Sequence, residues 1–292
     1  YMICALVIGA IWLYMAKGML ITQSLRHLLS KRVWLHASSK ADIKILLLNK
    51  AISLLYLPLI ITKATIAVWL FNQLFEQLGT RPIAGALLPD WAVVGCFTAF
   101  LFLLDDFARY YLHRLMHRVP MLWAFHKVHH SARRLTPLTV LRTHPVEGLL
   151  FTLRSVFVQG VSIGVFVFFF GDQVSLITVL GVNLAVFIFN VAGSNLRHSH
   201  IALRYGQRVE RWLISPAQHQ IHHSIERRHF DRNFGAVLAI WDRMGGSLYL
   251  SSANESLRFG LSKRIKQDEQ HLRTLYLRPF KEAAMSLVKR LL

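Results

Sequence analysis

The chain has 292 residues, of which 54% are hydrophobic, and its mean hydropathy is +0.39. This hydropathy excludes an ordinary soluble domain. Lysine and arginine number 34 against 15 acidic residues, a net charge of +19, but many of these cations flank apolar runs, as in membrane proteins. No nucleic-acid-binding motif accompanies them, so we expect no nucleic-acid partner. Only Cys4 and Cys96 occur, which excludes a disulfide framework and a cysteine-based metal site.

Five apolar runs are about as long as the roughly 20 residues that cross a bilayer. In chain order they are 1–22, 51–72, 91–112, 149–170 and 173–196. Pro58 and Lys63 interrupt the second run. The first run lacks a charged leading region and a small-residue cleavage site, so we expect a retained anchor. The sequence therefore predicts an all-α integral membrane protein with about five transmembrane helices.

Eight histidines fall in three short clusters, the first reading H-x-x-x-H and the others H-x-x-H-H. They are His113 and His117, then His126, His129 and His130, then His219, His222 and His223. On a helix, residues three and four apart share a face, so each cluster can aim its imidazoles at a common point. Neutral imidazole suits iron, zinc or copper. Eight donors exceed the needs of one tetrahedral ion, which predicts two metals sharing a site. Scattered surface histidines of a basic protein would not repeat H-x-x-H-H.

The distribution of cations predicts the orientation of the spans. Basic residues are concentrated in 17–50 and 113–148, whereas Arg81 is the only cation of 73–90. The positive-inside rule then places the two basic segments in the cytoplasm. Because 149–196 has the length of a two-helix hairpin, all three histidine clusters are expected on that cytoplasmic face. The membrane is expected to be a bacterial inner membrane or the endoplasmic reticulum.

Six sequence strings carry a resemblance to a known family. In order they are HRLMH, FHKVHHS, RTHPVEG, NLRHSH, SPAQHQIHHS and NFGAVLAIWDRMGG. Together they resemble the fatty acid hydroxylase / sterol desaturase superfamily over roughly 92–250. The resemblance implies a membrane-bound non-haem di-iron oxygenase with a cytosolic, histidine-lined helical cap. We expect a single membrane domain over 1–292, with N-terminal spans in 1–90, a fatty acid hydroxylase-like catalytic core in 91–250 and a cytosolic amphipathic segment in 251–292.

The resemblance adds His198 to the expected metal ligands, as the family's single histidine before the final box. The expected ligands are then His113, His117, His126, His129, His130, His198, His219, His222 and His223. His144 and His200 are left open as further ligands.

Three other polar residues are expected to support the ligands. Asp106 lies seven residues before His113, two helical turns along one face, and matches an aspartate of the family; a pair with a cation such as Lys63 is the alternative. Glu147 lies in a family HPxE element, with a helix N-terminal charge as the alternative. Asn195 is placed to bind a ligand or a metal-bound water.

The function predicted from this resemblance is O2-dependent hydroxylation of a membrane lipid: a fatty acyl, sterol, ether or amino-acid lipid. Desaturation is an alternative within the family, and a non-enzymatic metal-binding membrane protein is an alternative of another class. The expected cofactors are two iron ions, replaceable by zinc, and O2. No C-x-x-C-H or G-x-G-x-x-G string occurs, so electrons are expected from a separate reductase.

Five cations near the clusters could bind an anionic headgroup, or they could be present only because cytoplasmic segments of membrane proteins are rich in lysine and arginine. They are Arg133, Arg134, Arg142, Arg197 and Arg204. The C-terminal segment 276–292 has apolar residues at helical spacing with basic residues among them. It is expected either to lie on the membrane surface or to pack against the cap. The oligomeric state is left open.

Overall fold

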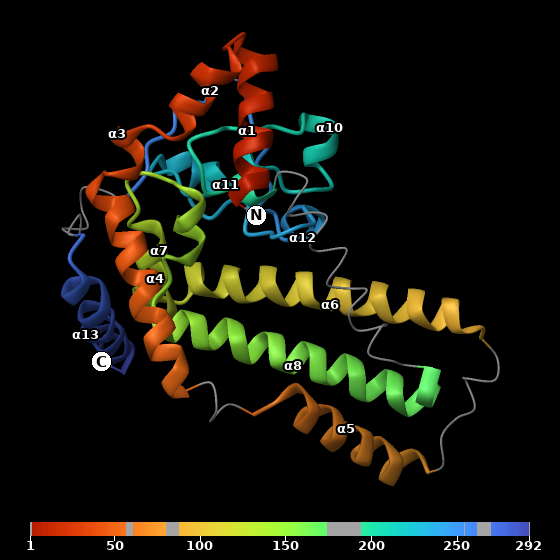
Figure 1. Ribbon diagram of the computed structural model, residues 1–292. Helices are drawn as coiled ribbons and strands as arrows, with labels where there is room; N and C mark the ends of the chain where they lie inside the picture. Colours follow the sequence, from red (N-terminus) through yellow and green to blue (C-terminus); the bar gives the residue numbers. More distant parts are fainter. Residues whose placement is uncertain are drawn as a thin grey trace. The chain divides into compact units, whose positions relative to one another are not determined.

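A computed structural model describes residues 2–56, 61–79, 88–173, 194–253, 255–261 and 270–291. Within these residues the regular elements are helices, together with two isolated β-bridges, which confirms the predicted all-α class (Figure 1). The longer helices are α1 (Met2–Lys17), α4 (Ala37–Tyr56), α5 (Lys63–Leu78), α6 (Asp90–Arg118), α7 (Pro120–His130), α8 (Pro145–Phe170) and α13 (Leu272–Leu291). The shorter α-helices are α2 (Ile21–Leu28), α3 (Lys31–Trp34), α10 (Gln207–Glu210), α11 (Pro216–His222) and α12 (Ile240–Met244). The 3-10 helices are η2 (Pro137–Leu141), η3 (Gly171–Gln173), η4 (Ser194–Leu196) and η5 (Arg227–His229).

The chain divides into two compact units. The first comprises 1–54, 110–148 and 189–292, and the second comprises 55–109 and 149–188. In the second unit, α6 and α8 run side by side around a buried apolar core (Figure 1). That core consists of Val93, Phe97, Leu101, Val158 and Phe166.

Two glycines on α8 allow α5 to lie directly against it in the second unit. A Cβ atom added at Gly160 would lie 2.6 Å from the Cβ of Ile66, and one added at Gly164 would lie 2.8 Å from the carbonyl oxygen of Ala67. Small residues four apart are typical of closely packed membrane helices. A larger side chain at either position would therefore separate α5 from α8.

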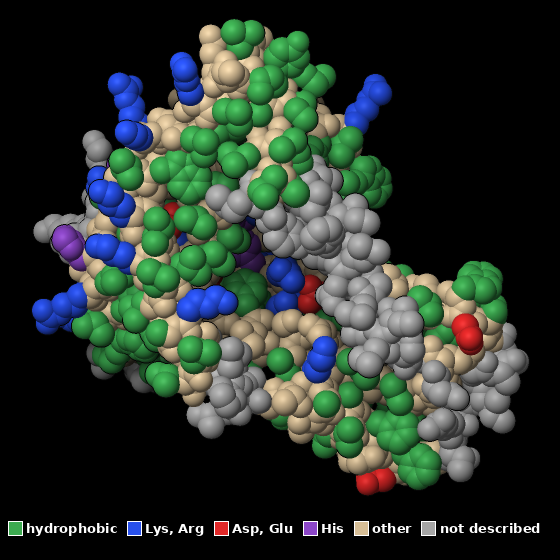
Figure 2. All heavy atoms as spheres, in the orientation of Figure 1, with side chains coloured by type: hydrophobic (Ala, Val, Ile, Leu, Met, Phe, Trp, Pro, Cys, Tyr) green, Lys and Arg blue, Asp and Glu red, His purple; other side chains and the backbone are tan. Residues whose placement is uncertain are grey.

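Two of the described helices, α6 and α8, are long and apolar enough to cross a membrane. They contain the predicted spans 91–112 and 149–170. Large apolar side chains are exposed on the helices of the second unit, among them Trp69, Phe100 and Phe157. Figure 2 shows many apolar side chains on the face that it draws, with basic side chains more frequent than acidic ones. Exposed apolar surface of this kind is typical of contact with lipid.

The other predicted spans fare differently. Span 51–72 is not one helix, because α4 ends at Tyr56, before Pro58, and α5 begins at Lys63. Thr62 is extended and its side chain accepts a hydrogen bond from the Thr65 amide, which caps α5. Span 1–22 is also interrupted, because α1 ends at Lys17 after 16 residues. Span 173–196 lies, apart from its two ends, outside the described residues.

In the first unit, α7 and α11 each begin with a proline at the first helical position. Ser215 precedes α11 and forms a reciprocal capping box with Gln218. The C-terminal helix α13 packs against α7, with Leu275 next to Val128. The C-terminal segment was expected either to lie on the membrane surface or to pack against the cap. The structure shows α13 packed against a histidine-bearing helix, α7.

Candidate metal centre

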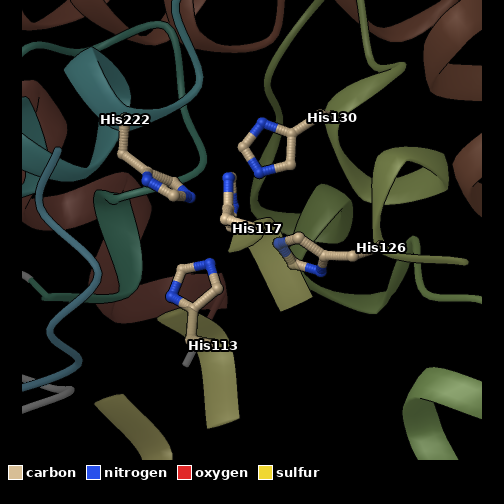
Figure 3. Close-up of side chains that lie close together, drawn as sticks. All are labelled: His113, His117, His126, His130 and His222. Carbon is tan, nitrogen blue, oxygen red and sulfur yellow. The ribbon is translucent and has the colours of Figure 1, made fainter. Parts of the chain in front are cut away.

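All nine expected ligands come together in the first unit, in two groups. The five-histidine group is His113, His117, His126, His130 and His222, shown in Figure 3. The four-histidine group is His129, His198, His219 and His223. Within each group the candidate ligand atoms lie within 4.8 Å of one another. The groups adjoin, because the rings of His130 and His223 stack with their centroids 4.4 Å apart.

Each H-x-x-H-H box divides between the two groups, which differs from the expectation that one cluster serves one point. In the box on α7, His126 and His130 join the five-histidine group and His129 joins the other. In the box on α11 the roles are exchanged, since only His222 joins the five-histidine group. Residues four apart lie close to one line along a helix, whereas the third histidine is offset around the axis. Two such helices can therefore contribute to both groups.

The four-histidine group has the spacing of ligands around one ion. His198 Nε2 lies 2.9 Å from His219 Nε2, 3.0 Å from His129 Nε2 and 3.1 Å from His223 Nε2. Nitrogens bound to a common ion at metal–nitrogen distances of about 2.0–2.1 Å lie roughly 2.9–3.4 Å apart. These four nitrogens can therefore hold one cation without large movement.

Among the residues that the structure describes, the opposite ring nitrogen, Nδ1, has an oxygen partner in four of the nine histidines. These pairs are His113 with Phe234 O (2.8 Å), His126 with Glu147 Oε1 (2.8 Å), His129 with Arg142 O (3.2 Å) and His222 with Arg232 O (2.8 Å). A carbonyl oxygen only accepts, so Nδ1 of His113, His129 and His222 carries the proton. Their Nε2 atoms are then unprotonated, and each carries a lone pair that a metal can accept. This is the usual arrangement of a ligating histidine.

The buried nitrogens of the five-histidine group test whether a metal fits. The Nε2 atoms of His117, His126, His130 and His222 are buried and have no hydrogen-bond partner within the described part of the chain. Buried polar atoms are normally paired, and unpaired ones are costly. A cation accepting these lone pairs removes that cost, so the residues fit a metal ion.

Burial also keeps these imidazoles neutral. It lowers the pKa of His129 to about 3. It holds the pKa of six others well below the ordinary value: His126, His130, His198, His219, His222 and His223. Metals bind imidazole in its neutral form, so the site is ready for metal near neutral pH.

The same shifts predict how the metal-free protein responds to acid. Because the folded-state pKa values lie below the ordinary value of 6.5, the unfolded chain binds more protons below that pH. The stability contributed by neutral histidines is therefore complete above about pH 6.5 and falls as the pH drops toward the folded-state values. We expect the thermal unfolding midpoint of metal-free protein to be lower at about pH 5.5 than at about pH 7.5. Equal midpoints at both values would contradict these pKa shifts.

The three expected supporting residues have different places. Glu147 is buried at the start of α8, and its Oε1 lies 2.8 Å from His126 Nδ1. Asp106 is buried on α6. Lys63, its alternative partner, instead donates to Gln159. Asn195 lies in η4. Roles for Asp106 and Asn195 toward a ligand stay predictions.

The two histidines left open belong to neither group. His144 uses both ring nitrogens elsewhere: Nε2 donates to the carbonyl oxygen of Tyr276, and Nδ1 accepts from the Val146 amide. His200 lies beside His27, with ring centroids 5.2 Å apart. Among the cations, Arg142 is fully buried, so it is unavailable to an external headgroup.

A loop after α11 provides oxygens that the sequence motifs do not reveal. Its Arg232 and Phe234 carbonyls accept from His222 and His113. The buried Asp242 carboxylate fixes this loop by accepting from the Phe234 and Gly235 amides at 2.8 and 2.7 Å. Backbone carbonyls have no residue-type signature, so only the NFG and WD strings around them could have drawn attention to this loop.

The sequence profile of the fatty acid hydroxylase family matches residues 98–247, which contain both histidine groups. This match covers more than half of the chain, and the chain therefore belongs to the fatty acid hydroxylase family. The predicted resemblance is confirmed.

Three curated relatives illustrate what the chain is similar to. Alkylglycerol monooxygenase of Homo sapiens is 29% identical over 168 residues, covering 58% of this chain and 34% of the relative. Ornithine lipid hydroxylase OlsE of Rhizobium tropici is 27% identical over 164 residues, covering 55% of this chain and 44% of the relative. Lathosterol oxidase of Homo sapiens is 25% identical over 185 residues, covering 63% and 54%.

The chain thus spans between about a third and about half of the length of these relatives. No solved structure matches it significantly.

Proposed function

We propose that the chain is an O2-dependent di-iron hydroxylase that oxidises a C–H bond of a membrane lipid. The observation that carries this proposal is the convergence of nine histidines, seven of them buried, into two adjoining groups. The five-histidine group would hold one iron and the four-histidine group the other. Zinc can replace iron in such sites, because imidazole binds both.

When bound, the two irons would supply the activation of O2 and the oxidation of the C–H bond. The chain's own residues hold the metals and limit access of water, since all seven candidate ligands outside α6 are buried. Glu147 orients His126, and the Arg142, Arg232 and Phe234 carbonyls orient three other ligands. In hydroxylation one oxygen atom enters the C–H bond and the other leaves as water. A separate electron-donor protein provides the two electrons, with two protons from solvent.

A lipid substrate is supported by the relatives and by the surface of the chain. The relatives named above are enzymes of an alkylglycerol, an ornithine lipid and a sterol. Large apolar side chains are exposed on α6 and α8, among them Phe100 and Phe157, where they can contact the acyl chains of a bilayer.

Desaturation of a lipid is the second candidate, because a delta(7)-sterol 5(6)-desaturase is 27% identical over 157 residues. We further propose a multi-pass membrane protein with its metal groups on the cytoplasmic face. The basic segment 113–148 contains five of the candidate ligands, and α6 and α8 are long enough to cross a bilayer.

The proposal is tested by lipid analysis of cells with and without the protein. Mass spectrometry of extracts should show a lipid that has gained one oxygen atom, and heavy-isotope O2 should label it. A lipid that loses two hydrogens without gaining oxygen indicates the desaturase. Identical lipid profiles, with metal-loaded protein and an electron donor present, contradict both activities.

A further inference from the structure

Arg142 makes an unusually complete set of contacts for a buried cation. Its side chain is fully buried, and all three guanidinium nitrogens donate hydrogen bonds. The acceptors are Val128 O (2.9 Å), Ser131 Oγ (2.7 Å), Ser38 O (3.3 Å), Asp42 Oδ1 (2.8 Å) and Gln270 Oε1 (2.6 Å). A lysine has no planar fork and cannot reproduce this arrangement.

Arg142 contacts α7 in two ways, on either side of one peptide unit. Its side chain donates to the Val128 carbonyl in the last turn of α7, which also accepts from the Ser131 amide and hydroxyl. The backbone carbonyl of Arg142 accepts from Nδ1 of His129, the residue that follows Val128. One residue therefore fixes both the backbone before His129 and the rotation of the His129 ring.

Asp42 on α4 holds Arg142 in this position. Its Oδ1 accepts from Arg142 Nη1 at 2.8 Å, and its Oδ2 accepts from Thr139 Oγ1 at 2.8 Å. Asp42 and Arg142 are both fully buried. Thr139 belongs to η2, so the Asp42 carboxylate connects α4 with η2 and with Arg142, which is hydrogen-bonded to α7.

We propose that Asp42 and Arg142 form a positioning clamp that acts through His129 on the four-histidine group. The clamp rests on the metal binding in the proposed function and adds two positioning residues to it. His129 Nε2 lies 3.0 Å from His198 Nε2, so a displaced His129 ring removes one of four converging nitrogens. The five-histidine group has other oxygen partners, Glu147, Arg232 and Phe234, which the clamp does not touch.

The proposal therefore predicts an effect on one metal position and not on both. The full chain, loaded with iron, is exposed to an excess of an iron chelator, and the release of iron is followed with time. In Arg142→Lys and Asp42→Asn, we expect one ion to leave about 10–100-fold faster than in the wild type, the range typical of lost orienting partners. The other ion should leave at the wild-type rate.

Pairs of substitutions identify the affected position. Asp42→Asn combined with His129→Ala should release iron no faster than His129→Ala alone, because both act on one ligand. Asp42→Asn combined with His117→Ala should show the sum of both effects, because His117 belongs to the other group.

Two further variants separate positioning from stability. Asp42→Asn leaves a buried arginine without its carboxylate, whereas the double variant Asp42→Leu, Arg142→Met removes both buried charges, a change that is often neutral for stability. We expect the double variant to keep the wild-type unfolding temperature and still lose one ion faster. Asp105→Asn is the matched control, because Asp105 also forms an ion pair with an arginine, Arg154, but in the second unit. This variant should release both ions at the wild-type rate.

Wild-type release rates in folded Arg142→Lys and in the double variant would overturn the clamp and leave the metal centre standing. Equal acceleration of both ions would also overturn it, because the effect would then be general loosening. A folded wild-type chain that takes up no iron would overturn the proposed function, and the clamp with it.

Discussion

Replacing His198 with alanine is expected to abolish lipid oxidation and to remove one metal ion. His198 is the hub of the four-histidine group, because its Nε2 lies within 3.1 Å of the Nε2 atoms of His129, His219 and His223. Loss of a ligand should exceed the roughly 10–100-fold effect of losing an orienting partner. Elemental analysis of the purified variant should show about half of the wild-type metal content, and turnover should be undetectable.

His271→Ala is the matched control for this substitution. His271 is exposed and belongs to neither group, so metal content and turnover should stay at the wild-type level. If His198→Ala kept full metal content and turnover in a folded protein, the four-histidine group would not be a metal site.

Replacing Glu147 is expected to have the second-largest effect, and the effect should depend on the substitute. Glu147→Leu leaves Nδ1 of His126 without an acceptor in a buried environment and frees the ring to turn. Glu147→Gln keeps an oxygen acceptor and loses only the charge. We expect metal affinity and turnover to fall by about 100-fold in Glu147→Leu and by about 10-fold in Glu147→Gln.

The orienting role of Glu147 is tested by comparing the metal affinities of the two variants. Metal affinity is measured by competition with a chelator, together with the unfolding temperature of each variant. A structural role alone would lower the unfolding temperature of both without changing the affinity of the folded protein. Equal affinities in the wild type, Glu147→Gln and Glu147→Leu would therefore reject the orienting role.

The side chains of the candidate site were predictable because histidine boxes carry their chemistry in residue type and spacing. Their division into two groups was not, because a box of three histidines on one short helix does not reveal which neighbour each ring will meet. The structure assigns His129 and His222 away from the other members of their boxes. That assignment depends on how α7 and α11 face each other, which is a tertiary property.

The partners of the ligands were predictable only where they were side chains in a recognisable string. Glu147 stands in such a string, whereas Asp42 lies far from the boxes in sequence and contacts the site through Arg142 and Thr139. Span 51–72 is not one helix, because α4 ends at Tyr56 and the cap at Thr62 starts a new helix at Lys63. Pro58 and Lys63 marked an interruption in the sequence, but they did not show that a new helix begins there.

If both histidine groups bind metal, this chain holds two metal ions. The most direct test is elemental analysis of purified, folded protein, with protein concentration determined independently. We expect two ions per chain, iron in active preparations and zinc where zinc has replaced it. One ion or none per folded chain would contradict the two-metal centre.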